Sequence, residues 1–170
     1  CTQFDEGFFE RKIIEFVKRN KPTKPIYIRP LIYTSDLDLS PRLHDIEWDT
    51  LIYGLEMGDY LKSAGITCTI SSWQRQQDAS FPLRGKISGA YITSALAKTE
   101  AVKRGFDEAI LMNAHGKVSE GSAMNIFVVR NGIIRTPGIT EDILEGITRD
   151  SVIQIARSLG YTLIEGQIDK

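Results

Sequence analysis

Two short apolar runs on either side of Asn131-Gly132 constrain the fold of this chain more than any other feature of its sequence. The runs cover residues 126–130 and 133–136. Asn-Gly is favoured in the two-residue turns that join antiparallel strands, because both turn positions need a positive φ. The sequence therefore predicts a β-hairpin at this point, and the fold must include antiparallel pairing.

Helical patterns occur at three other places. Apolar residues recur at helical spacing over residues 5–20 and predict an amphipathic helix. A second helix is expected to begin at or just after Lys86 and to end at Gly105. A third is expected to follow Thr148, a favourable N-cap, and to end at Gly160.

The remaining segments alternate between strand patterns and irregular stretches. Strands are expected at residues 25–34, 66–72, 107–112 and 161–164. Residues 35–49 are rich in Asp, Ser and Pro and predict a loop. Residues 50–62 are interrupted by Gly54 and Gly58, so we expect a short helix or an interdomain connection there.

These elements predict an α+β fold in two lobes. Residues 1–60 are expected to form part of a small domain, residues 61–65 the connection, and residues 66–170 part of a larger domain with a barrel-like sheet. The chain begins without methionine and ends directly after an expected strand. We therefore expect a fragment that is incomplete at both ends.

Charge and composition exclude several classes of function. The net charge is −1, which gives no basic surface for nucleic acid. No apolar run is long enough to span a membrane. Cys1 and Cys68 have no metal-ligand spacing and form no disulfide framework, so we expect no metal and a cytoplasmic location.

Three places carry side chains or backbone suited to chemistry. Lys86 lies just before the second expected helix, and Glu120 precedes a turn of small residues. Gly146-Ile147-Thr148 lies at the start of the third expected helix. A helix start offers backbone N–H groups to an anion. Taken singly, such a lysine is more commonly solvated, such a glutamate is more commonly a surface carboxylate, and such a helix start is more commonly an ordinary cap.

Arg29 lies between tyrosines on one face of the strand expected at residues 25–34. The spacing alone favours an exposed arginine stacked on a neighbouring tyrosine. The alternative is a clamp for a carboxylate, which a guanidinium group can bind through two hydrogen bonds.

The order of these features resembles the branched-chain amino acid aminotransferases, which belong to the fold-type IV pyridoxal phosphate (PLP) enzymes. The resemblance covers most of the chain and is strongest from Ser71 to Gly160. The matching motifs are Lys86-x-x-Gly89-x-Tyr91, Gly116-x-Val118-Ser119-Glu120-Gly121, Asn125-Ile126-Phe127, Thr136-Pro137 and Gly146-Ile147-Thr148-Arg149. The resemblance implies the D-amino acid aminotransferase-like fold of that group.

The resemblance also implies a role for each residue of a cofactor site. Lys86 is expected to hold PLP as a Schiff base and, once released, to move the proton between the substrate and the cofactor. Glu120 is expected to pair with the ring nitrogen and keep it protonated, which makes the ring an electron sink. Tyr91 is assigned to the ring hydroxyl, and the backbone N–H groups of Ile147 and Thr148 to the phosphate.

Three further residues are implied in substrate recognition. Tyr27 and Arg29 are expected to bind substrate, with Arg29 meeting the distal carboxylate of glutamate. Tyr53 is expected beside the substrate side chain, at a position where many family members have tryptophan.

The resemblance implies transamination of leucine, isoleucine and valine with 2-oxoglutarate by a homodimer in branched-chain amino-acid biosynthesis. D-amino acid aminotransferase and aminodeoxychorismate lyase share the fold, and a metabolite-binding domain without activity is a further alternative.

Full-length members contact the phosphate through an N-terminal arginine and a C-terminal threonine-rich segment that these residues do not include. A polypeptide limited to residues 1–170 is therefore expected to bind PLP weakly or not at all and to lack activity.

Overall fold

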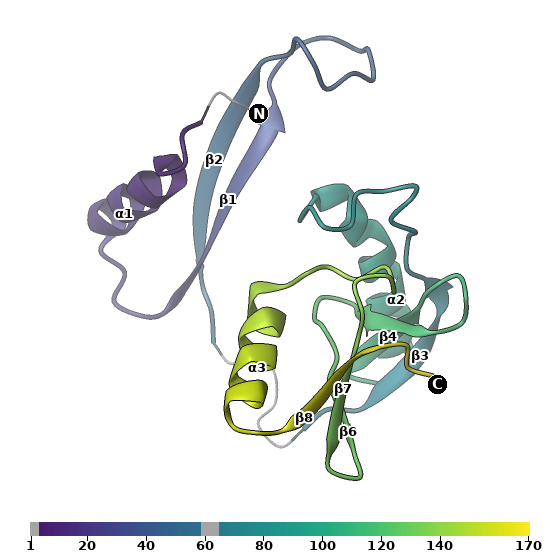
Figure 1. Ribbon diagram of the computed structural model, residues 1–170. Coiled ribbons are helices and arrows are strands. Elements are labelled where there is room, and N and C mark those ends of the chain that lie inside the picture. The colour runs from purple at the N-terminus through teal and green to yellow at the C-terminus, as the bar shows by residue number, and fades with distance from the viewer. Residues whose placement is uncertain (1–3, 59–64) are drawn as a thin grey trace. The chain divides into compact units, whose positions relative to one another are not determined.

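The computed structural model describes residues 4–58 and 65–170, and the chain divides into two compact units (Figure 1). Unit one is Cys1–Lys62 and unit two is Ser63–Lys170. Most of the connection expected at residues 61–65 lies outside the described residues, and the expected domain boundaries stay a prediction. No helix in the described part of the chain is long and apolar enough to cross a membrane.

Unit one contains helix α1 (Phe8–Asn20) and the strands β1 (Ile26–Thr34) and β2 (Trp48–Glu56). The strands form an antiparallel hairpin that pairs without interruption from Ile26 opposite Glu56 to Thr34 opposite Trp48. The expected helix and first strand are thus confirmed.

The interpretation of residues 50–62 as a helix or a connection is wrong, because β2 runs through Glu56. Gly54 does not break this strand. A Cβ atom at Gly54 would lie 3.1 Å from two ring carbons of Phe16, so the missing side chain accommodates an aromatic ring of α1. This glycine serves packing between helix and strand rather than a turn.

Unit two contains two three-stranded sheets and two longer helices (Figure 1). Its elements are β3 (Cys68–Gln74), the 3₁₀ helix η1 (Ser88–Ala90), α2 (Tyr91–Lys103), β4 (Glu108–Met112), β5 (Val118–Gly121), β6 (Val128–Arg130), β7 (Ile133–Pro137), α3 (Ile147–Ser158) and β8 (Thr162–Gly166). The predicted hairpin is confirmed as β6–β7, with φ of 53° at Asn131 and 73° at Gly132.

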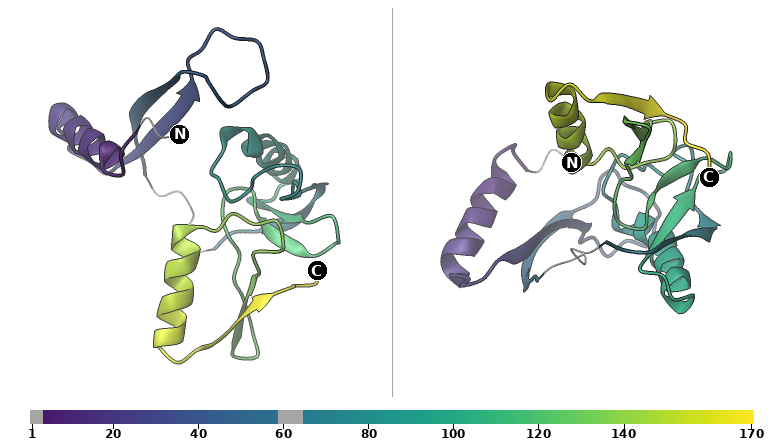
Figure 2. Two further views of the ribbon diagram at one scale, coloured as in Figure 1. Left: turned by 45° about the horizontal axis from the view of Figure 1, so that its top comes forward. Right: turned by 90° about the horizontal axis from the view of Figure 1, so that it is seen from below.

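Each sheet contains one parallel pair whose strands are joined through a helix. β3 and β4 are parallel and connected through α2, and β7 and β8 are parallel and connected through α3. Figure 2 shows α3 running alongside β8. Because the helix of a βαβ unit starts near the carboxyl end of its first strand, both helices begin where ligands commonly bind in such sheets.

The core of unit two is built from small side chains. Ala97 and Ala101 of α2 and Ala109 and Leu111 of β4 are each 0% exposed, and Phe106 packs against them. Small residues on the buried face of α2 allow the helix to lie close to the sheet. The position of α2, and of the loop that precedes it, is therefore fixed by tight packing.

We expect Ala97→Leu to lower the free energy of unfolding by about 1–3 kcal/mol, because extra methyl groups in a filled core force neighbours out of place. The matched control is Ala95→Leu, an exposed position on the same helix that should change stability by less than about 0.5 kcal/mol. Urea titration of both variants checks this. Equal stability of the two variants would contradict the tight packing of α2.

Candidate active site

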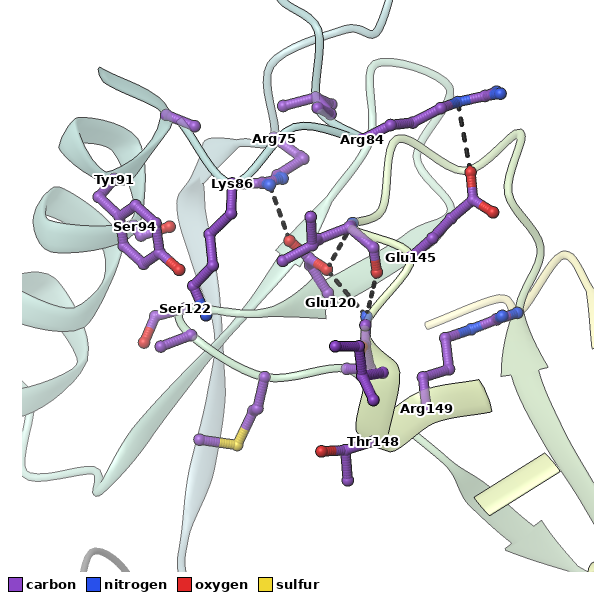
Figure 3. A pocket seen from close by; sticks show the side chains of 18 of the residues that line it. Arg75, Arg84, Lys86, Tyr91, Ser94, Glu120, Ser122, Glu145, Thr148 and Arg149 are labelled. Carbon is purple, nitrogen blue, oxygen red and sulfur yellow. Dashed lines mark hydrogen bonds and ion pairs between the residues drawn. The ribbon is translucent and has the colours of Figure 1, made fainter. Parts of the chain in front are cut away.

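A cavity of about 720 Å³ in unit two is formed by three segments that are distant in sequence (Figure 3). They are the loop before α2, the end of β5 with the turn that follows it, and the loop before α3. The cavity brings together five residues that the sequence analysis selected, namely Lys86, Tyr91, Glu120, Ile147 and Thr148.

Lys86 lies in a tight turn directly before η1. The N–H of Gly85 donates to the carbonyl of Pro82 at 3.1 Å, and the N–H of Ile87 donates to the carbonyl of Gly85 at 2.9 Å. Figure 3 shows the Lys86 side chain extending into the cavity beside Tyr91. No described residue forms an ion pair or a hydrogen bond with its amine, so the amine is available to a ligand.

Tyr91 is the first residue of α2, because η1 occupies the turn between it and Lys86. This start of the helix lies later than the sequence predicted. The short 3₁₀ turn brings the lysine and the tyrosine to the same wall of the cavity, where the phenol and the amine can contact one ligand.

Glu120 lies on the buried strand β5 and forms an ion pair of 2.8 Å with Arg75. The two side chains are only 8% and 6% exposed, respectively. The other Glu120 oxygen, Oε2, accepts hydrogen bonds from the amide of Asn125 at 3.1 Å and from the N–H of Leu144 at 3.0 Å. A carboxylate has about four acceptor sites, so these contacts leave capacity for a donor in the cavity.

The surroundings of Glu120 fit a positively charged ligand. Burial raises the pKa of its carboxyl group above the ordinary value, although the Arg75 guanidinium and the Leu144 N–H act in the opposite direction. Burial thus makes the negative charge costly at this position, and a cationic N–H group in the cavity would stabilise it. A protonated ring nitrogen is such a group.

The start of α3 fits a phosphate group. Gly146, not Thr148, is the N-cap, so the prediction of Thr148 as the cap is wrong. Gly146 is extended with φ of −69° and ψ of 140°, and among the described residues no side chain caps the helix. The N–H groups of Ile147 and Thr148 in the first turn therefore have no partner within the helix and are oriented to bind an anion.

Two polar residues of the site, the buried Arg75 and the half-buried Asn125, were missed by sequence reasoning. Arg75 directly follows β3, and its pairing with Glu120 joins segments far apart in the chain. Asn125 belongs to a motif that the sequence analysis noted, but nothing in the motif showed what its amide contacts. Both depend on tertiary contacts that local patterns do not reveal.

The three residues expected to bind substrate lie together in unit one. Arg29 donates to the hydroxyl of Tyr27 through Nε at 3.2 Å and Nη2 at 3.1 Å, and its guanidinium carbon lies 5.4 Å from the centre of that ring. Tyr53 of β2 is directly opposite Arg29 in the hairpin. The contact with a neighbouring tyrosine that the spacing favoured is therefore present, but Arg29 is half-buried rather than exposed. A carboxylate-binding role for Arg29 stays a prediction.

Known proteins are similar to this chain over nearly its whole length. Residues 2–170 match the family described as amino-transferase class IV. A probable branched-chain-amino-acid aminotransferase from Synechocystis sp. is 65% identical over 158 residues, which cover 93% of this chain and 52% of that protein. The chain spans about half the length of the curated relatives it matches.

Two solved structures share the fold. The branched-chain aminotransferase of the archaeon Thermoproteus uzoniensis with norvaline has a TM-score of 0.95 at 39% identity, over 99% of this chain and 57% of that one. The enzyme of Thermobaculum terrenum in its PLP form has a TM-score of 0.92 at 34% identity, over 99% and 56% of the two chains. The predicted α+β fold is thereby confirmed.

Proposed function

The chain belongs to the class IV aminotransferases, and from this premise we propose that the protein transfers amino groups between branched-chain amino acids and 2-oxoglutarate, with PLP as its cofactor. The observation that carries the proposal is one cavity that holds an amine, a buried carboxylate and a helix start, at Lys86, Glu120 and Ile147. Within the described ranges 4–58 and 65–170, no side chain pairs with the amine or caps the helix. The names of the relatives and the PLP and norvaline in the related structures support it.

Each end of the cavity has a proposed task. When bound, PLP supplies an electron sink for the carbanion that forms at the substrate Cα. Lys86 would hold the cofactor through its aldehyde carbon, whose oxygen leaves as water, and after release its amine would hold and move the proton at Cα. Glu120 keeps the proton on the ring nitrogen, Tyr91 donates to the ring hydroxyl, and the N–H groups at Ile147 and Thr148 hold the phosphate.

Substrate recognition is assigned to Tyr27, Arg29 and Tyr53 of unit one. The Arg29 guanidinium suits the distal carboxylate of glutamate, and the Tyr27 hydroxyl already orients it at 3.1 Å. Tyr53, opposite Arg29, offers an aromatic surface to an apolar side chain.

We also propose a cytoplasmic homodimer that acts in branched-chain amino-acid biosynthesis. The family resemblance supports this proposal, and the free, exposed thiol of Cys68 fits only the part that concerns a reducing compartment. Light scattering of the full-length protein measures the oligomeric state directly.

The substrate class is tested by single half-reactions of the full-length protein loaded with PLP. Leucine, isoleucine, valine and glutamate should each convert the cofactor to its amine form, with loss of the absorbance of the aldehyde form. D-alanine should not, and aminodeoxychorismate should not be cleaved. Reaction with D-alanine alone would favour a D-amino acid aminotransferase, cleavage of aminodeoxychorismate would favour a lyase, and no reaction with any of these compounds would favour a binding domain.

The phosphate contact can be tested at one backbone atom. In Ile147→Pro the first helical residue loses its N–H, while the helix should persist because proline suits this position and Gly146 is already extended. The Ile147 side chain is 87% exposed, so its loss should matter little. A hydrogen bond to a charged group contributes about 1.5–3 kcal/mol, so PLP affinity should fall about 10- to 100-fold.

The matched control is Ile147→Ala, which removes the same side chain and keeps the N–H. Pyridoxal, which lacks the phosphate, should bind both variants as it binds the wild type. Equal PLP affinity of the proline and alanine variants would show that the N–H of residue 147 does not hold phosphate.

A further inference from the structure

Asn125 connects the Glu120 carboxylate to the loop that leads into α3. Its Nδ2 atom donates to Glu120 Oε2 at 3.1 Å and to the carbonyl of Leu144 at 2.8 Å. Leu144 in turn donates its N–H to the same Glu120 oxygen at 3.0 Å. We infer that Asn125 is a positioning residue that fixes the distance between the ring-nitrogen contact and the phosphate contact of the cofactor, an inference that rests on the proposed function.

A tight turn brings Asn125 back beside Glu120. The N–H of Gly121 donates to the carbonyl of Met124 at 2.8 Å. A Cβ atom at Gly121 would lie 2.7 Å from the Met124 side chain, so the turn needs glycine there. The chain therefore reverses directly after Glu120 and presents the Asn125 amide to both Glu120 and the loop before α3.

The orientation of the amide explains the glycine at the start of α3. With Nδ2 directed at two oxygens, Oδ1 faces Gly146, and a Cβ atom at that position would overlap it. The φ of −69° at Gly146 is open to any residue, so the backbone conformation does not require glycine. What requires it is the close approach of Asn125.

The same contacts immobilise the loop that leads into α3. The carbonyl of Leu144 accepts from both Asn125 Nδ2 and the N–H of Gly146, each at 2.8 Å. Gly146 is the N-cap, so the first N–H groups of the helix follow directly from this anchored segment. A shift of the Asn125 amide therefore loses its contact with the Glu120 carboxylate, its contact with the loop before α3, or both.

Two single substitutions and their combination test the inference in the full-length protein. Asn125→Ala removes both amide contacts, and Gly146→Ala displaces the amide by steric overlap. Each should weaken PLP binding at least about tenfold, since a contact to a charged carboxylate is lost. The double variant should be no worse than Asn125→Ala alone, because the overlap disappears with the amide.

Gly166→Ala is the matched control, since nothing lies within 4 Å of a Cβ atom placed there. It should bind PLP as the wild type does. Additive losses in the double variant would overturn the inference, because they would show that Gly146 acts independently of Asn125.

Comparing PLP with pyridoxal separates positioning from a general structural role. Glu120→Gln should weaken the binding of both ligands by the same factor, and Ile147→Pro should weaken the binding of PLP alone. Asn125→Ala should weaken the binding of pyridoxal, and it should weaken the binding of PLP by a larger factor, because the contribution of the phosphate is also reduced. If Asn125→Ala lowers only the thermal stability and leaves both affinities unchanged, Asn125 is structural and the inference is wrong.

Hydrogen exchange gives a readout that does not need the cofactor. In the cofactor-free protein, Asn125→Ala should speed the exchange of the Leu144 N–H. This N–H donates to Glu120, and the substitution removes the hydrogen bond from Asn125 that holds the Glu120 carboxylate in place. A wild-type protein that binds neither PLP nor pyridoxal would refute the proposed function and the positioning role together. If the wild-type protein binds PLP but the Leu144 N–H of Asn125→Ala exchanges no faster than that of the wild type, the positioning role alone is refuted.

Discussion

Lys86→Ala should reduce the turnover of leucine with 2-oxoglutarate about 10⁴-fold or more. The amine is proposed both to bind the cofactor and to move the Cα proton, and a positioned proton-transfer group alone contributes up to about 10⁴-fold. Lys86 is exposed in the loop before η1 and packs in no core, so the substitution should leave the fold intact. Steady-state assays with near-wild-type circular dichroism check this.

Two control variants make the Lys86 result specific. Lys86→Arg keeps the positive charge but not a nucleophilic amine, and it should be as inactive as Lys86→Ala. Lys103→Ala removes an exposed lysine at the far end of α2 and should turn over normally. Turnover of Lys86→Ala within tenfold of the wild type would exclude Lys86 as the cofactor lysine.

Glu120→Gln should lower kcat on the order of 10²–10³-fold, the usual cost of removing one preorganised electrostatic group from an active site. A neutral amide does not hold the proton on the ring nitrogen, so the electron sink is weakened. The substitution also leaves Arg75 buried without its ion-pair partner, which costs about 3–5 kcal/mol of stability for a fully buried pair.

The two effects of Glu120→Gln can be separated. Adding Arg75→Gln removes the unpaired charge, so the double variant should regain stability without regaining turnover. Glu120→Asp keeps the charge and should retain more activity than Glu120→Gln. Recovery of kcat together with stability in the double variant would mean that Glu120 serves the fold rather than the cofactor.

Local patterns were sufficient where one segment determines its own structure. The Asn131-Gly132 turn adopts the positive φ angles that the sequence predicted. The strand and helix expected on either side of Lys86 are present as β3 and α2. Lys86, Glu120 and the start of α3 could be selected because each belongs to a short motif.

Features that depend on distant contacts could not be predicted. Gly54 looked like an interruption because its packing partner, the ring of Phe16, lies on another element. Thr148 looked like a cap because threonine is a common one, whereas Gly146 takes that position next to Asn125. The Arg75–Glu120 ion pair joins segments that only the folded sheet brings together.

The central claim is that the cavity around Lys86 and Glu120 is the PLP site, and reductive trapping tests it most directly. Sodium borohydride delivers hydride to the C=N bond between a lysine amine and the aldehyde carbon of PLP, which makes the link permanent. After digestion of the reduced full-length protein, mass spectrometry should find the phosphopyridoxyl group on the peptide that contains Lys86, in one equivalent. A label on another lysine, or cofactor that is retained but never becomes covalently attached, would contradict the account.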